Sequence, residues 1–142
     1  MNKFAFRALA SLLVLLLSIG ACSYWLRGTL DDVAQEKPAA ESAGFEFGKG
    51  TDEYGCVKEA AARINQAQSI KGAALTGAFL EACLKTSTAT PGFCDDVPRS
   101  DERFKSGAWA VSVCDQFGQD SRYCRKVMEL IPRYCDRTHR FR

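Results

Sequence analysis

The chain has one histidine and no closely spaced pair of cysteines. His139 lies three residues from the C-terminus of this 142-residue sequence, where we expect an exposed tail residue. A single histidine leaves little room for His-based metal sites or Ser-His-Asp arrangements. No two cysteines are separated by only two to four residues, as in structural zinc sites and thioredoxin-like redox motifs. We therefore expect no metal and no cofactor.

Alternating β-branched runs and internal repeats of fixed period are also missing from the sequence. Without such runs a β-sheet is not expected. There is little net charge, because Lys3 and Arg7 alone account for the formal charge of +2. Net charge thus indicates no partner, and we do not expect nucleic acid binding. The stretch from Asp120 to Arg142, with seven bases against three acids, is typical of a solvated helix face and tail.

The carboxylate pairs Asp95-Asp96 and Asp101-Glu102 are close sequence neighbours. Two carboxylates that catalyse hydrolysis must flank a substrate across a cleft. Neighbours in a loop or a first helical turn favour turn formation and dipole complementation instead. The sequence therefore predicts no catalytic residue.

Cysteine is the informative residue. Six of the seven cysteines fall in the C-terminal part of the chain, and an even, dense set in a small exported domain predicts a disulfide framework. These six are Cys56, Cys83, Cys94, Cys114, Cys124 and Cys135. Fifteen pairings are possible. We favour Cys114 with Cys124, across a corner at Gly118, and keep thiol redox chemistry as an alternative role.

The N-terminus carries a targeting pattern. Lys3 and Arg7 precede an apolar run from Ala8 to Gly20, which is the order of charged and apolar regions in a signal peptide. The residues Ile19-Gly20-Ala21-Cys22 that end this run resemble the lipobox of bacterial lipoproteins. The resemblance implies that Cys22 is lipidated and becomes the new N-terminus. As the odd cysteine, Cys22 is free for that use.

Two other fates of the N-terminal segment stay open. The stretch from Ala8 to Leu26 has nineteen residues, about enough to span a bilayer as an uncleaved helix. Tyr24 and Trp25 would then lie at the outer interface. Alternatively, cleavage after Gly20 or Ala21 would release the protein.

Three regions follow from these patterns. Residues 1–21 are predicted to be a signal peptide or membrane anchor, and residues 56–142 a disulfide-stapled helical domain. Residues 22–55 contain few large apolar groups and predict a flexible tether, with a short helix possible from Leu30 to Glu36.

The fold class predicted for the domain is all-α, a small bundle of about four short helices cross-linked by disulfides. The first two helices are predicted over 56–68 and 73–85, followed by a loop over 86–98. Ser100 is predicted to cap a third helix, and a fourth is expected from about 120 to 136, with Pro132 kinking or shortening its last turn. The predicted buried face of the third helix is the stripe of Phe104, Ala108, Val111 and Cys114. That of the fourth is the stripe of Cys124, Val127, Met128, Ile131 and Cys135.

Trp109 lies off the third helix's stripe, which predicts either an exposed anchor for a partner or packing under the tether. A weaker candidate partner surface is formed by Arg122, Tyr123, Arg125 and Lys126. We expect a membrane-anchored cell-envelope protein, with its domain on the periplasmic or extracellular side, that binds an envelope protein or polymer without catalysis. The alternative is a small secreted enzyme inhibitor or enzyme.

Overall fold

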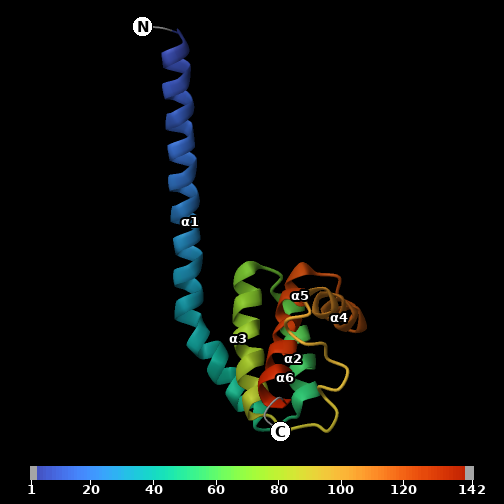
Figure 1. Ribbon diagram of the computed structural model, residues 1–142. Helices are drawn as coiled ribbons and strands as arrows, with labels where there is room; N and C mark the ends of the chain where they lie inside the picture. Colours follow the sequence, from blue (N-terminus) through green and yellow to red (C-terminus); the bar gives the residue numbers. More distant parts are fainter. Residues whose placement is uncertain (1–2, 140–142) are drawn as a thin grey trace. The chain divides into compact units, whose positions relative to one another are not determined.

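The computed structural model describes residues 3–139, without the side chains of residues 3–6, 8 and 139, and these residues form two compact units. The first unit ends at Gln35 and is helical from Lys3 onwards. The second unit begins at Glu36 and contains the rest of the described chain. Figure 1 shows the described helices, which are α1 (Lys3–Gly48), α2 (Glu53–Gln66), α3 (Ile70–Thr86), α4 (Arg103–Gln116), α5 (Arg122–Met128) and α6 (Leu130–His139).

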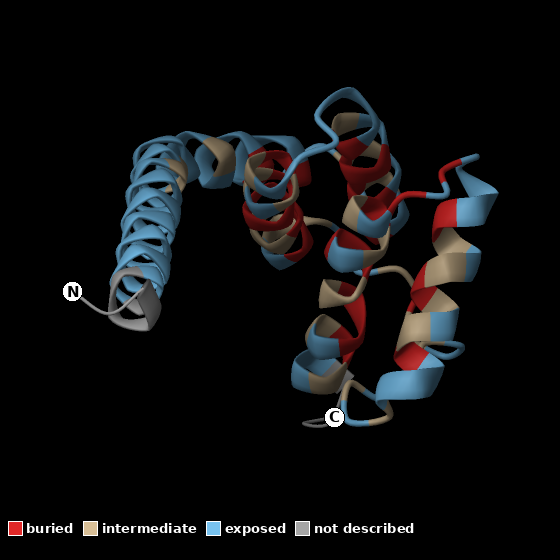
Figure 2. Ribbon diagram, turned by 90° about the horizontal axis from the view of Figure 1, so that it is seen from above, coloured by how far each residue is buried: buried red, intermediate tan, exposed pale blue. Residues whose placement is uncertain are grey.

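The second unit is an all-α bundle, as predicted. Buried residues of α2 to α6 lie on the sides of these helices that face one another (Figure 2), and they form one apolar cluster around Ile64, Phe79, Leu80 and Met128. Side-chain caps begin three of the helices. Asp52 accepts a hydrogen bond from the Gly55 N–H (2.8 Å), Ser69 accepts one from the Gly72 N–H (2.9 Å), and Ser121 accepts one from the Tyr123 N–H (3.2 Å). The cap at Ser69 starts α3 three residues earlier than predicted.

All six domain cysteines are paired, as predicted. The α2–α3 bridge joins Cys56 to Cys83, and a second bridge joins Cys94, in the loop before α4, to Cys135 on α6. The α4–α5 bridge joins Cys114 to Cys124 across a corner where Gly118 has a φ of +67°. The preferred pairing of these two residues is therefore confirmed. Glycine suits that corner because other residues rarely adopt a positive φ.

The last turns of α1 differ from the expected flexible chain. Helix α1 continues to Gly48, and its residues from Glu36 onwards pack on α3. A Cβ added to Gly44 would lie 2.2 Å from the Phe79 carbonyl oxygen, and one on Gly48 would lie 2.6 Å from that of Cys83. Missing side chains thus let the two backbones approach closely, and Phe47 adds a ring contact with Phe79, with 5.8 Å between the ring centroids. The division into targeting segment, tether and domain stays a prediction.

The inward face of α4 was predicted wrongly. Phe104 is 96% exposed, and the buried residues of α4 are Ser106, Ala110 and Cys114. Ser106 can face inward because its hydroxyl donates a hydrogen bond to the Arg99 carbonyl (2.7 Å), and its small size, like that of Ala110, permits close helix packing.

Ser100 does not cap α4. The helix begins at Arg103, three residues after Ser100, and Glu102 at the N-cap position makes no side-chain capping bond. Ser100 instead donates two hydrogen bonds to the Asp136 carboxylate on α6, from its N–H (3.0 Å) and its hydroxyl (2.5 Å). These bonds fasten the loop before α4 to the last helix.

The predicted fourth helix is two helices. Helix α5 ends at Met128 and α6 begins at Leu130, with Glu129 between them. Pro132 explains the position of the break, because its ring clashes with the carbonyl four residues earlier, which belongs to Met128. Pro132 therefore lies in the first turn of α6, where it is tolerated, and the interruption precedes it rather than falling in the last turn.

Candidate functional site

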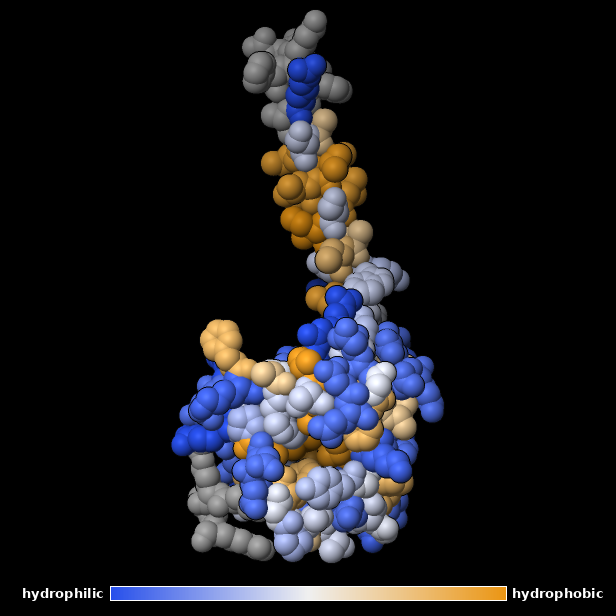
Figure 3. All heavy atoms as spheres, turned by 90° about the vertical axis from the view of Figure 1, so that its right-hand side faces the viewer, coloured by the Kyte–Doolittle hydropathy of each residue, from blue (hydrophilic) through white to orange (hydrophobic). Residues whose placement is uncertain are grey.

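Cys22 and the apolar run before it lie on an exposed part of α1. The leucines from Leu9 to Leu17 are each at least 59% exposed, and Cys22 is an exposed free cysteine. Figure 3 shows hydrophobic side chains gathered along this part of the helix. By length and composition, α1 contains a segment able to cross a membrane. So much exposed apolar surface is unfavourable in water and indicates a lipid environment or removal as a signal peptide.

The second unit has an apolar groove over α3, with a volume of about 750 Å³. Its floor consists of Ala73, Ala74, Gly77 and Ala78, four small residues on one side of α3. Ile70, Tyr123 and Leu130 add apolar surface from α3, α5 and the start of α6.

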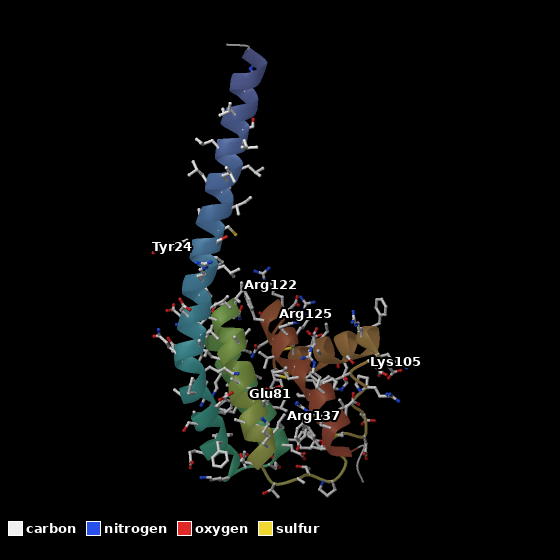
Figure 4. The ribbon with its side chains drawn as sticks, turned by 60° about the vertical axis from the view of Figure 1, so that its left-hand side comes forward. Tyr24, Glu81, Lys105, Arg122, Arg125 and Arg137 are labelled. Atoms are coloured by element: carbon white, nitrogen blue, oxygen red, sulfur yellow. A yellow bond between two sulfur atoms is a disulfide. The ribbon has the colours of Figure 1, made fainter. Side chains whose placement is uncertain are left out.

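Charged side chains line the rim of this groove. Lys37 comes from α1, Arg122 and Lys126 come from α5, and Glu81 comes from α3. Arg122 donates a hydrogen bond to the Tyr123 hydroxyl (3.0 Å), and its guanidinium lies 4.9 Å from the centre of that ring. Figure 4 shows Arg122 near the start of α5 and Glu81 on α3, where Glu81 lies 3.8 Å from Arg137. Three cations and one anion leave the rim net positive.

Trp109 does not belong to this groove. It is partly buried against the core and lines a separate cavity of about 280 Å³ with Tyr54, Val57 and Phe93. Trp109 is therefore only partly exposed, and its use as an anchor for a partner stays a prediction. Tyr54 falls within residues 22–55, the range predicted as the tether, and the other neighbours come from later in α2, the loop before α4 and α6. Trp109 and the α5 cluster thus do not form one surface.

The α5 cluster is partly brought together. Arg122, Tyr123 and Lys126 line the groove over α3, whereas Arg125 does not. Lys126 also lines a polar cavity of about 380 Å³ between α4 and α6, together with Arg103 and Arg133. The ion pair that Lys126 makes with Glu129 (3.3 Å) is exposed, so it restrains the lysine weakly.

A buried polar cluster joins α2, the loop before α4 and α6. Glu53 is buried, and its carboxylate accepts hydrogen bonds from the Tyr134 hydroxyl (2.8 Å) and the Thr90 N–H (2.6 Å). Burial raises the pKa of Tyr134 above its ordinary value, and the hydrogen bond to Glu53 raises it further. Both oxygens of Glu53 have partners inside the domain, so we assign the cluster to stability.

Two of the carboxylates singled out in the sequence make exposed ion pairs, Asp101 with Arg99 (3.1 Å) and Glu102 with Lys105. A carboxylate oxygen of Asp95 lies 3.3 Å from the position that a Cβ on Gly92 would take, in the loop around the Cys94 bridge. The side chain of His139 lies outside the described residues. Within residues 3–139, no group of three or more His, Cys, Asp or Glu side chains is arranged to hold a metal ion.

Comparison of the chain with protein-family models, curated proteins and solved structures gives no match. The fold itself defines the class: a small all-α bundle with three disulfides among the described residues, following a long apolar helix. These features fit a membrane-anchored or secreted protein whose bundle lies in an oxidising compartment.

Sequence reasoning missed the floor of the groove. Small residues at helical spacing are usually interpreted as a packing face, but the α3 atoms that contact Gly44 and Gly48 belong to Phe79, Cys83 and Thr86. Ala73, Ala74 and Gly77 lie on the α3 side that lines the groove. A signal was present in the run Ala73-Ala74-Leu75-Thr76-Gly77-Ala78, which is too rich in small residues to fill the space between helices by itself.

Proposed function

We propose that the chain is a membrane-anchored cell-envelope protein that displays its disulfide-stapled bundle on the oxidising side of the membrane, where the bundle binds an envelope partner without catalysing a reaction. One observation carries this proposal: exposed apolar residues of α1 precede a domain whose six cysteines are all paired. The apolar segment supplies an attachment to lipid, and the disulfides require an oxidising compartment.

Lipidation at Cys22 is our preferred mode of attachment. Its support is the lipobox-like sequence from Ile19 to Cys22 and the fact that Cys22 is left over from the three bridges and is exposed. Several acyl chains would hold the mature protein stably, because each buried CH₂ contributes about 0.8 kcal/mol. An uncleaved helix from Ala8 to Leu26 is the runner-up and leaves the domain equally attached.

The decisive experiment measures the mass of the mature N-terminus in protein purified from membranes. We expect a chain that begins at Cys22 and carries lipid on its sulfur. The variant Cys22→Ala should accumulate as full-length precursor, while the matched variant Ser23→Ala should be processed normally. If the natural chain itself keeps Met1, and Cys22→Ala changes neither its processing nor its place in the membrane fraction, a spanning helix attaches the chain instead of lipidation.

A soluble mature chain that begins after Gly20 or Ala21 and carries no lipid would overturn the anchored proposal altogether. Cross-linking in intact envelopes tests the binding role: the expected result is a reproducible protein or polymer adduct on the bundle. Repeated recovery of the bundle without an adduct would count against that role. Titration of the native protein for free thiols addresses the redox alternative, since the stapled domain should contribute none.

A further inference from the structure

The groove over α3 has the size and surface of a site for an acyl chain. Its floor of alanines and glycine is smooth and apolar, Ile70 at one end is 62% exposed, and the volume of about 750 Å³ lies within the ordinary range of small-ligand sites. Ala74 in the floor is also exposed. A small domain gains stability by covering such surface, so an uncovered groove indicates an occupant.

The rim of the groove is complementary to an anion. Arg122 makes no ion pair with a carboxylate among residues 3–139, and its contacts with Tyr123 hold the guanidinium at the rim. Lys37 and Lys126 pair with Glu41 (3.5 Å) and Glu129 (3.3 Å), both on the exposed surface. Such pairs contribute about 0–1 kcal/mol each. The two lysines can therefore turn to a phosphate at little cost.

The chain itself keeps this groove near the membrane. Thirteen residues separate Cys22, the proposed site of lipidation, from Glu36, where the second unit begins. Even a fully extended chain of this length spans only about 50 Å. Lys37 on the groove rim is the second residue of that unit. Lipid headgroups are thus the most concentrated anions within reach.

We propose that the groove binds an anionic phospholipid of the membrane that holds the chain, with one acyl chain along the floor of α3 and the headgroup phosphate against Arg122, Lys126 and Lys37. The inference rests on the proposed function for the presence of the membrane. It also gives the α5 cluster a definite role. A docked protein fits less well, because the groove offers eleven lining residues, whereas a standard protein interface uses about 20–30 on each side.

The test uses the full chain in nanodiscs of neutral phosphatidylcholine. Each sample contains a trace of phospholipid with a photoreactive group on its acyl chain, either anionic phosphatidylglycerol or neutral phosphatidylcholine. Cross-links are mapped by mass spectrometry. We expect the anionic probe to label residues 70–78 more strongly than the neutral probe. Retention of the chain on the nanodiscs reports the anchor separately, so its loss would indicate failure of the anchored proposal rather than of the groove.

Two variants and one control sharpen the result. Arg122→Gln should lower labelling of α3 by the anionic probe about five-fold, the usual effect of one cation near an anionic lipid. Arg133→Gln, which removes the same charge outside the groove over α3, should leave that labelling unchanged. Ala74→Phe should fill the groove and abolish labelling of α3 by both probes while the chain stays bound to the nanodiscs.

Several outcomes would overturn the lipid groove. Equal labelling of α3 by the two probes would show that the cations on the rim do not select an anionic lipid. An equal change in labelling for Arg122→Gln and Arg133→Gln would show that Arg122 does not bind the headgroup. An unlabelled α3 in a chain that stays bound to the nanodiscs would exclude the acyl chain. In a parallel sample treated with a protein cross-linker, links into the groove from residues 26–33 of the same chain or from a second copy would identify a different occupant.

Discussion

Gly44→Ala tests whether the end of α1 is part of the bundle or a loose connection. The added Cβ would lie 2.2 Å from the Phe79 carbonyl oxygen and 2.9 Å from its carbonyl carbon. Both are backbone atoms of a buried helix, so neither can rotate away. An ordinary van der Waals contact lies at about 3.5–4.0 Å, so α1 would have to move outward by more than an ångström.

The size of the effect follows from two opposing contributions. Overpacking of this kind typically costs about 1–3 kcal/mol, and a clash with fixed backbone belongs at the upper end of that range. Replacing glycine by alanine also stabilises the helix by about 1 kcal/mol, because glycine is a poorer helix former. We therefore expect the packing of residues 36–48 on α3 to weaken by about 2 kcal/mol, which corresponds to a thirty-fold loss of hydrogen-exchange protection.

Hydrogen exchange of the full chain in nanodiscs measures this change, and Gly28→Ala is the matched control in the same helix. No atom lies within 4 Å of a Cβ built on Gly28, so this variant should only gain helix stability, by about 0.5–1 kcal/mol. Gly28→Ala should increase the hydrogen-exchange protection of the helical turn around residue 28. If Gly44→Ala likewise increased the protection of residues 36–48, the close packing of α1 on α3 would be refuted.

Two further predictions concern the stability of the bundle. Removing the α2–α3 bridge by paired Cys→Ala changes should lower the free energy of unfolding more than removing the α4–α5 bridge. Their sequence separations of 27 and 10 correspond to about 3.6 and 2.7 kcal/mol of loop entropy. All four cysteines are equally buried, so burial does not separate the two cases. Urea unfolding measures both, and an equal or reversed order would contradict loop length as the cause. Tyr134 has a raised pKa in the fold, so the stability it contributes is present below its unfolded pKa of about 10 and declines as the pH rises above that value. The free energy of unfolding should therefore fall less between pH 9 and pH 11 for Tyr134→Phe than for the natural chain. An equal fall in both proteins would show that Tyr134 does not cause this pH dependence.

Local patterns in the sequence were sufficient for the fold class and for one cross-link. Apolar residues and cysteines recur at helical spacing, and this periodicity predicts helices whatever their partners are. Cys114 and Cys124 lie on consecutive helices joined by a short corner at Gly118, so local geometry alone brings them together. The order of charged and apolar residues at the N-terminus likewise predicts export, and the exposed apolar part of α1 and the three disulfides fit that prediction.

The choice between competing faces depended on the whole bundle. Helix α4 carries two possible inward stripes that share Cys114, and the sequence favours the one with the larger apolar residue, Phe104. The structure buries Ser106 and Ala110, because small residues let α4 approach its neighbours and the Arg99 carbonyl satisfies the serine hydroxyl. That carbonyl belongs to another segment, so no pattern within the helix reveals it.

Close backbone contact was likewise decided only by tertiary structure. Glycines at 44 and 48 indicate flexibility when the segment is considered alone, yet opposite α3 they form a surface on which a helix packs. The groove over α3 arises in the same way, since α1, α5 and the start of α6 border a floor of small residues that lie apart from them in the sequence. Helical periodicity is a property of neighbours along the chain, whereas a seam or a groove exists only where distant segments meet.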